Sequence, residues 1–198
     1  PVVVYVNTTA ETKAAADLTC TSSNAVKVVE QLQVDRVLFG PDANLAQFVQ
    51  ERLPKVEIIK IPETGHCYVH RRFDVKTIKK LKEQYPDAVV YAHPECNVAV
   101  QHIADYVGST SAMYRFGLET DAEVVIFATE KGLIDRLNKE RPQKTFLVAK
   151  QTAICKNMKK ITLEKVRDAL LYEQFEVIVP EEIRVKAEKA IIRMLDLS

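Results

Sequence analysis

The sequence has almost no excess charge of either sign and no long apolar run. Its 198 residues carry 28 Lys and Arg against 27 Asp and Glu, whereas proteins that bind nucleic acid mainly through phosphates carry a clear basic surplus. No apolar stretch approaches the roughly 20 residues that a membrane-spanning helix needs. With 47% hydrophobic residues, the composition favours a soluble, well-cored protein and argues against a nucleic-acid partner or a membrane anchor.

Cysteine is also scarce, and none of the four cysteines lies in a CxxC motif. Four are too few for a disulfide scaffold, and no signal peptide precedes them, so we expect reduced thiols and a cytoplasmic location. The missing CxxC spacing also disfavours a thiol-redox protein. Pro1 stands directly before the apolar run Val2–Val4, an abrupt start that leads us to expect further protein upstream.

Short runs rich in β-branched residues alternate with segments of helical period. The helical segments include 45–53 and 75–81, the latter ending before Pro86. This alternation predicts an α/β fold in which parallel sheets have helices on both faces. The runs that we interpret as buried strands are Val2–Val6, Val37–Phe39, Val56–Ile61, Val89–Tyr91, Val124–Phe127, Phe146–Val148 and Val177–Val179.

Residues that favour helix starts follow several of these runs. Helix N-termini at the carboxyl ends of parallel strands favour anionic ligands, because free N–H groups and the helix dipole point toward them. The alternative is that each residue only caps its helix. The candidates are Thr8 with Glu11 at capping-box spacing, Pro41 at a first helical position, and the N-cap types Ser22, Ser23 and Asn24.

The two halves of the chain resemble each other at an offset of 88 residues. This period is too long for a solenoid and indicates duplication of a small α/β domain. The strand Val3–Tyr5 also parallels Val89–Tyr91 after a short slip, which places Asn7 opposite His93. The aligned identities include Ala16-Asp17 with Ala104-Asp105, Phe39 with Phe127, Leu45 with Leu133, Pro54 with Pro142, and Cys67 with Cys155.

This register singles out two of the four cysteines. Equivalent residues of duplicated domains can converge on a pseudosymmetry axis, so Cys67 and Cys155 could point into one metal site. The alternative is that each is a buried, inert thiol, and this is our interpretation of Cys20 and Cys96, which have no symmetry partner. Two thiolates do not complete an iron–sulfur cluster, which takes four protein ligands, or three when one iron stays open.

The end of the chain points to a further domain. A helix over Thr162–Leu171 and a strand over Val177–Val179 match Val75–Leu81 and Val89–Tyr91 of the preceding repeat, and a terminal helix over Glu181–Leu195 follows. We expect these elements to dock on a domain outside this sequence, which would supply the third cysteine.

Short motifs run through the whole chain in a characteristic order. They are Tyr5-Val6-Asn7-Thr8, Thr21-Ser22-Ser23-Asn24-Ala25, Gly40-Pro41-Asp42-Ala43-Asn44-Leu45, Gly65-His66-Cys67, His93-Pro94-Glu95-Cys96, Gly108-Ser109-Thr110, Val179-Pro180-Glu181-Glu182-Ile183 and Arg193-Met194. In this order they resemble the motifs of the quinolinate synthase family. One departure is Ser111-Ala112 before Met113, where that family commonly has a glycine before the methionine.

The resemblance implies three homologous α/β domains around a central [4Fe–4S] cluster with one open iron. Residues 1–67 and 68–155 would be the second and third domains, and 156–198 a helix-strand-helix tail on the absent first domain. The implied reaction condenses iminoaspartate with dihydroxyacetone phosphate to quinolinate in NAD biosynthesis. An aspartate oxidase or dehydrogenase would supply the iminoaspartate. This chain alone would be inactive.

The resemblance also assigns roles to residues at the predicted strand ends. His93 and Glu95 would be acid/base and positioning groups, since both types move protons when their pKa values lie near neutrality. Tyr5 would bind substrate and take part in catalysis. Further substrate contacts would come from Asn7, Ser22, Ser109 and Thr110, and the cluster ligands would be Cys67 and Cys155.

Several alternatives remain beside these roles. His93 could cap a turn, and Tyr5 could be a core aromatic. The resemblance makes neither His66 nor His70 a ligand; we interpret His70 with Arg71 and Arg72 as a solvated basic turn, and His102 as structural. A different class of function is a non-catalytic module of the same fold that binds anionic metabolites or a partner.

Overall fold

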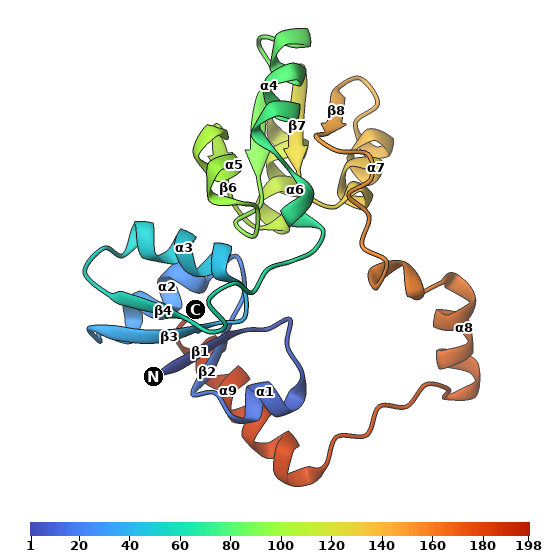
Figure 1. Ribbon diagram of the computed structural model, residues 1–198. Coiled ribbons are helices and arrows are strands. Elements are labelled where there is room, and N and C mark those ends of the chain that lie inside the picture. The colour runs from blue at the N-terminus through green and yellow to red at the C-terminus, as the bar shows by residue number, and fades with distance from the viewer.

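The computed structural model describes all 198 residues and contains two parallel four-stranded sheets, each flanked by helices in a three-layer α/β arrangement (Figure 1). The predicted fold class is therefore confirmed. No helix combines the length and apolar character needed to cross a bilayer.

The first sheet has the order β2-β1-β3-β4. Its core includes Val3, Leu18, Phe39, Leu45 and Val49, which come from strands and helices alike. The strands are β1 (Val2–Tyr5), β2 (Leu18–Cys20), β3 (Arg36–Gly40) and β4 (Glu57–Lys60), and the helices are α1 (Ala10–Ala14), α2 (Ala25–Gln31) and α3 (Ala43–Arg52).

The second sheet repeats this order as β6-β5-β7-β8. A separate core surrounds Phe127, Ile126, Met113 and Leu137. The strands are β5 (Val89–Ala92), β6 (Tyr106–Val107), β7 (Val124–Ala128) and β8 (Thr145–Val148), and the helices are α4 (Val75–Gln84), α5 (Val98–Ile103), α6 (Thr110–Glu119) and α7 (Lys131–Glu140).

The offset of 88 residues relates the bounds of whole elements. Shifting β3, β4, α3 and α4 by 88 residues gives the bounds of β7, β8, α7 and α8 (Leu163–Tyr172). The short 3-10 turns η1 (His70–Arg72) and η2 (Met158–Lys160) are related in the same way. The repeat in the sequence is therefore a repeat of structure.

The end of the chain differs from the prediction in one element. Residues 177–179 form no strand; Val177 and Ile178 are 84% and 79% exposed. A β-branched run becomes a strand only where a neighbouring strand pairs with its N–H and C=O groups, and neither sheet offers one here. In Figure 1, α8 stands apart from both sheets.

The terminal helix α9 (Glu181–Asp196) returns to the first sheet, where it packs on α1 and β2. Met194 enters that core, and the Thr19 hydroxyl donates to its sulfur at 3.4 Å. This part of the tail thus contacts residues 1–67. Docking of 156–178 on a further domain stays a prediction.

Two predicted helix starts are wrong by one or two residues. Thr9, not Thr8, caps α1, since its side chain accepts from Thr12 N. Pro41 is not a first helical residue; α3 begins at Ala43 and Asp42 caps it. Asn24 is the residue before α2, as predicted, but its side chain makes no capping bond.

Candidate functional site

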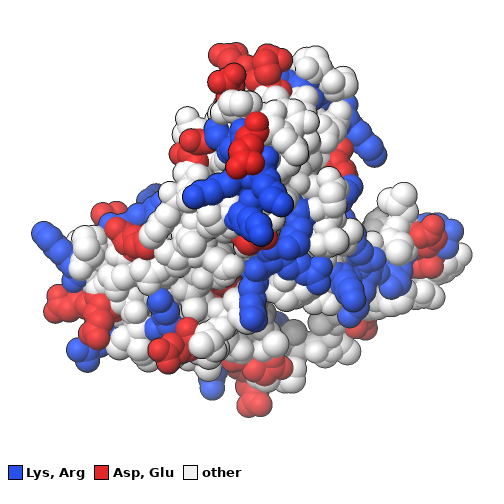
Figure 2. Space-filling view, turned by 45° about the horizontal axis from the view of Figure 1, so that its top comes forward, with Lys and Arg blue, Asp and Glu red and all other residues white.

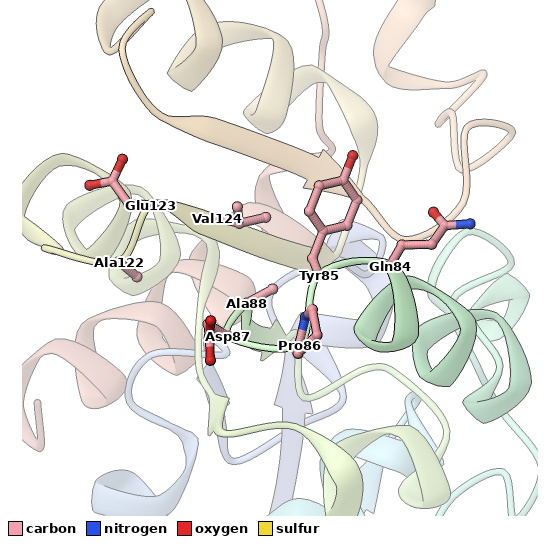
Figure 3. Close-up of a pocket in the computed structure, with 8 residues that line it drawn as sticks. All are labelled: Gln84, Tyr85, Pro86, Asp87, Ala88, Ala122, Glu123 and Val124. Atoms are coloured by element: carbon pink, nitrogen blue, oxygen red, sulfur yellow. The ribbon is translucent and has the colours of Figure 1, made fainter.

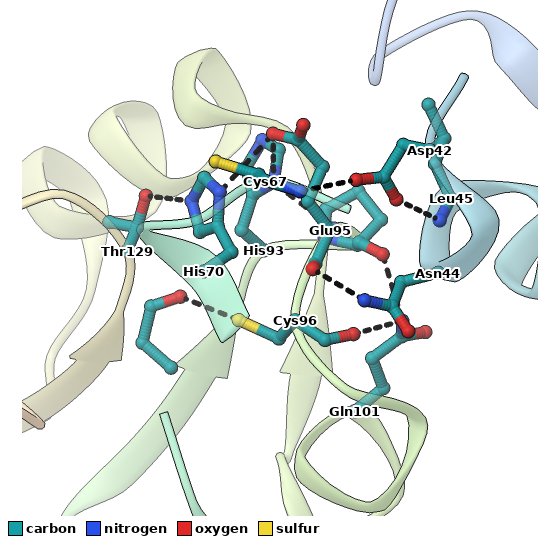
Figure 4. A network of polar contacts seen from close by, with 12 residues as sticks. Asp42, Asn44, Leu45, Cys67, His70, His93, Glu95, Cys96, Gln101 and Thr129 are labelled. Carbon is teal, nitrogen blue, oxygen red and sulfur yellow. Dashed lines mark hydrogen bonds and ion pairs between the residues drawn. The ribbon is translucent and has the colours of Figure 1, made fainter. Parts of the chain in front are cut away.

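Polar residues from both sheets gather where the strands end (Figure 4). Tyr5 ends β1 and Asp42 follows β3, while His93 follows β5 and Thr129 follows β7. The carboxyl ends of parallel strands are where α/β proteins bind ligands. The site is therefore built at the edge that the sequence predicts, with contributions from both repeats.

A buried carboxylate holds the loop that carries Cys67. Asp42 Oδ1 accepts from Leu45 N at 2.8 Å and caps α3, while Oδ2 accepts from Cys67 N at 2.9 Å. Burial raises the pKa of Asp42 to about 6, and the nearby Glu95 charge adds to this, although the backbone N–H groups favour the carboxylate. One side chain thereby fixes both the helix start and the cysteine loop.

The second repeat uses the same arrangement for Cys155. Glu130 Oε2 accepts from Gly132 N at 2.6 Å at the start of α7, and Oε1 accepts from Cys155 N at 3.2 Å. Asp42 and Glu130 are separated by the same 88 residues as the two cysteines. Neither acidic residue belongs to the predicted site. The offset of 88 residues between them is the sequence signal that could have identified them.

The two cysteine loops contact each other. The Tyr68 hydroxyl lies 3.5 Å from Cys155 Sγ and accepts from Lys156 N at 2.7 Å. Arg72 Nη1 donates to Thr152 O at 2.7 Å. Both thiols are free and half-buried. Burial opposes ionisation of Cys155, but hydrogen bonds from Tyr68 and from backbone N–H groups lower its pKa, which favours the thiolate that binds metals.

A cluster of two histidines and a glutamate lies beside the Cys67 loop (Figure 4). Glu95 Oε2 is 3.2 Å from His70 Nδ1 and 3.3 Å from His93 Nδ1. The two imidazole rings stack with centroids 4.3 Å apart. All three residues are buried. The predicted pair His93 and Glu95 is thus in contact, and His70 joins it.

The placement of His70 corrects the sequence interpretation. The predicted solvated turn is wrong for His70, which is 7% exposed, although Arg71 and Arg72 are exposed. The ring is held by Thr129, whose Oγ1 lies 3.1 Å from Nε2. Burial works to lower the pKa of His70, but Cys67 and Glu95 outweigh it and raise the pKa to about 9.

His93 has the opposite electrostatic environment. It is 2% exposed, and burial together with the neighbouring His70 holds its pKa well below the ordinary value. Its Nδ1 accepts from Glu95 N at 3.2 Å. A neutral ring that accepts at Nδ1 carries its proton on Nε2, so His93 is prepared to donate a hydrogen bond from that atom.

Tyr5 and Asn7 line a hollow of about 410 Å³ together with Asp42, Cys67 and Glu95. Tyr5 is buried, and burial and the Glu95 charge raise the pKa of its hydroxyl, which therefore stays protonated. With His66, which also lines it, the hollow brings six polar or thiol side chains from both repeats around one space. It is the place where a small polar molecule would meet Cys67 and Glu95.

Ser22, Ser109 and Thr110 are not among the residues that line this hollow. Ser22 is half-buried beyond β2. Ser109 is buried and caps α6, with its Oγ accepting from Ala112 N at 3.3 Å, and Thr110 is the exposed first residue of that helix. Ser109 is therefore a helix cap, which was not predicted from the sequence, and its role toward an anion stays a prediction.

Replacing Ser109 by alanine removes this cap. We expect the free energy of unfolding to fall by about 1 kcal/mol, because an orphan N–H group of α6 loses its acceptor. Urea denaturation followed by circular dichroism measures it. Ser109→Asp should retain the stability, since Asp caps as well as Ser, while adding a negative charge that would repel an anion. Equal losses in both variants would contradict the capping role.

Gly65 lets the Cys67 loop approach the backbone before α3. A Cβ at this residue would lie 1.8 Å from the Pro41 carbonyl oxygen, and Ala43 N donates to Gly65 O at 2.7 Å. In the second repeat the equivalent residue is Ala153, whose O accepts from Lys131 N at 3.0 Å. Close approach therefore requires glycine only in the first repeat.

Replacing Gly65 by alanine should displace the Cys67 loop. We expect a destabilisation of about 1–3 kcal/mol, typical of overpacking against an atom that cannot move aside. Thermal unfolding measures this cost. The matched comparison, Ala153→Gly, removes a methyl group that is buried in the second core and adds backbone freedom, so it should cost about 1–2 kcal/mol without displacing the Cys155 loop. A Gly65→Ala variant as stable as the parent would show that the loop shifts freely.

Basic side chains surround the cysteine loops. The turns η1 and η2 carry Arg71, Arg72, Lys159 and Lys160, all exposed. Figure 2 shows Lys and Arg side chains gathered in a band across this face of the molecule. Such a band attracts anions toward the site even though the whole chain is nearly neutral.

Another pocket lies at the amino ends of β5 and β7 (Figure 3). Its lining has two carboxylates, Asp87 and Glu123, and no cysteine or histidine. It is at the opposite end of these strands from His93 and Thr129. The candidate site is therefore the one at the carboxyl ends and not this pocket.

The fold and the site define an α/β protein of two repeated parallel-sheet units, with a polar, thiol-containing site made by both. A family model described as quinolinate synthetase A protein matches residues 1–196. The chain belongs to this family.

Relatives in three archaea carry the name quinolinate synthase. The chain is 52% identical to that of Methanocaldococcus jannaschii over 199 residues, covering 98% of this chain and 64% of the relative. Identity is 51% to the Methanothermobacter thermautotrophicus protein and 50% to that of Pyrococcus furiosus, each covering 100% of this chain and 64% of the relative. The chain thus spans about 64% of the length of the curated relatives it matches.

Proposed function

We propose that this chain is the part of a quinolinate synthase that carries two of its cluster cysteines and its acid/base group. The reaction would condense iminoaspartate with dihydroxyacetone phosphate to quinolinate in NAD biosynthesis. The observation that carries the proposal is the pair of equivalent loops in contact, each with a cysteine held by a buried acidic cap, next to His93 and Glu95. An aspartate oxidase or dehydrogenase would supply the iminoaspartate.

The donor set fits the metal group that the proposal requires. Cys67 and Cys155 are free, half-buried thiols on adjacent loops, and thiolates are the ligands of iron–sulfur clusters. Cys20 and Cys96 are fully buried in the two cores. A third ligand would therefore come from outside these 198 residues. When bound, a [4Fe–4S] cluster with one open iron would supply a Lewis acid for dehydration.

The residues of this chain would bind and orient the substrates around that centre. Tyr5, protonated and facing the hollow, would donate a hydrogen bond to a carboxylate or carbonyl oxygen, and Asn7 would add amide contacts. His93, neutral with its proton on Nε2, would donate to a developing oxyanion, while Glu95 would accept a proton. Ser22, Ser109 and Thr110 would contact carboxylate or phosphate oxygens near helix starts.

The division into units 1–67, 68–155 and 156–198 is part of the proposal. Val166 of α8 is the residue equivalent to Ile78 of α4; Ile78 is buried in the second core, whereas Val166 is 45% exposed. Leu163, Leu170 and Ile178 are also exposed. Large exposed apolar surfaces mark interaction sites. This supports docking of 156–178 on the part of the full-length protein that lies outside this chain.

The test uses the full-length protein, reconstituted with iron and sulfide without oxygen. We expect iron–sulfur absorbance, and we expect quinolinate to form when both substrates are present, detected by mass spectrometry. Binding of dihydroxyacetone phosphate without quinolinate formation would overturn the proposal in favour of a non-catalytic module that binds anionic metabolites.

A further inference from the structure

Three different metal-binding atoms converge beside the hollow. Cys67 Sγ, a His70 ring nitrogen and a Glu95 carboxylate oxygen all lie within 4.8 Å of one another (Figure 4). His70 and Glu95 are buried and Cys67 is half-buried. A thiolate, an imidazole and a carboxylate are the ligand types of three-ligand zinc sites.

One ring nitrogen of His70 has a hydrogen-bond partner and the other has none. Nε2 lies 3.1 Å from Thr129 Oγ1. Nδ1 is buried, has no hydrogen-bond partner and lies 3.2 Å from Glu95 Oε2 in an ion-pair contact. A partner on the second nitrogen is the usual support of a metal-binding histidine. The unpartnered Nδ1 is therefore oriented as a ligand toward Cys67 and Glu95.

The surrounding electrostatics favour a cation at this point. Glu95 Oε2 lies between two ring nitrogens, His70 Nδ1 and His93 Nδ1, and the latter already accepts from Glu95 N. A buried carboxylate is costly unless a positive centre lies beside it, and a bound metal ion would supply one in place of the proton on His70.

We propose that Cys67, His70 and Glu95 bind one divalent transition-metal ion of the zinc class. Tetrahedral bonds of about 2.0–2.3 Å place ligand atoms roughly 3.3–3.7 Å apart, which the His70–Glu95 separation of 3.2 Å nearly matches. Cys67 Sγ lies within 4.8 Å of the other two atoms, and movement of this half-buried side chain would bring it to bonding distance. The fourth position opens into the hollow lined by Tyr5 and Cys67, where water or a substrate oxygen completes the coordination.

The site has a consequence for the proposed function, with which it shares Cys67. An ion bound here occupies a thiolate that the cluster also needs, so zinc-class ions compete with cluster assembly. The two sites nevertheless differ in their other ligands. Cys155 belongs only to the cluster, whereas His70 belongs only to the mononuclear site. Variants of Cys155 and of His70 can therefore test the cluster proposal and the mononuclear-site proposal separately.

The experiment titrates Co²⁺ into the reduced, cluster-free, full-length protein. We expect one ion per chain, with absorption bands of tetrahedral cobalt and thiolate-to-cobalt charge transfer, and displacement by Zn²⁺. His70→Ala should weaken binding by more than about 100-fold, since loss of even a supporting partner costs 10–100-fold. Thr129→Val, which removes that partner at nearly constant volume, should weaken it by about 10–100-fold.

Two further variants complete the test. Cys155→Ala should retain the cobalt spectrum while losing the cluster, and His70→Ala should still assemble the cluster, which also shows that this variant is folded. His102→Ala is the control, because His102 is exposed and pairs with Glu51 away from the site. Cobalt binding that survives His70→Ala but disappears in Cys155→Ala would overturn the proposal, as would the absence of any thiolate-to-cobalt band.

Discussion

Replacing Cys67 and Cys155 together by alanine is expected to abolish both iron–sulfur absorbance and quinolinate formation in the full-length protein. Each cysteine would supply one of three thiolates, and a cluster that loses two has too few protein ligands to stay bound. The fold should survive, because both thiols lie half-buried on loops outside the strands. Iron and sulfide content, visible absorbance and product formation measure the loss.

Cys20→Ala is the matched control for this pair. Cys20 is fully buried in the first core and is not a predicted cluster ligand, so its truncation is expected to cost packing alone. We expect a modest loss of thermal stability with the cluster content unchanged. Quinolinate formation that persists in the double variant would contradict the proposed function. A cluster lost equally in Cys20→Ala would show that the absorbance does not report on Cys67 and Cys155.

Strands were predictable where a β-branched run also has a neighbour. The runs at β3, β4, β7 and β8 are confirmed because each pairs with a strand of its own sheet. The segment 177–179 has the same composition but no pairing partner, and it remains irregular. Two short strands, in contrast, were not predicted although they do pair. β2 and β6 have three and two residues, too few for a periodic signal, and their pairing with β1 and β5 defines them.

The site was predictable where a residue's position alone decides its surroundings. Tyr5, His93 and Glu95 follow or end strands, and the rule for parallel sheets places such residues at one edge. The bonds from Asp42 and Glu130 to the cysteine N–H groups span 25 residues, and nothing local distinguishes these acids from ordinary helix caps. They could be identified only together, through the offset that relates them.

His70 shows why local composition can mislead. Its neighbours Arg71 and Arg72 indicate solvent, and both are exposed. The residues on either side of that turn, Val69 and Phe73, are each 1% exposed and pack into the second core. The 3-10 turn therefore directs one face inward, and His70 lies on it. Tertiary packing decides the burial of His70, and the local sequence of three basic residues does not predict it.

His93→Gln is expected to lower kcat/KM for quinolinate formation by about 10²- to 10⁴-fold in the full-length protein, the usual contribution of a positioned acid/base group. This corresponds to about 3–5.5 kcal/mol of transition-state stabilisation. The ring is almost completely buried, with Nδ1 accepting from Glu95 N and Nε2 carrying the proton. Glutamine can offer one hydrogen bond there but cannot exchange a proton. Steady-state kinetics measure the effect.

The cluster absorbance should be unchanged in His93→Gln, because His93 is not among the residues that would bind metal. This separates a catalytic loss from a loss of the metal centre. His102→Gln is the matched control: the side chain is exposed and pairs with Glu51, so we expect kcat/KM within a few-fold of the parent. If His93→Gln retains full activity, the ring serves packing alone. If activity and absorbance fall together, its contribution is to the structure of the site.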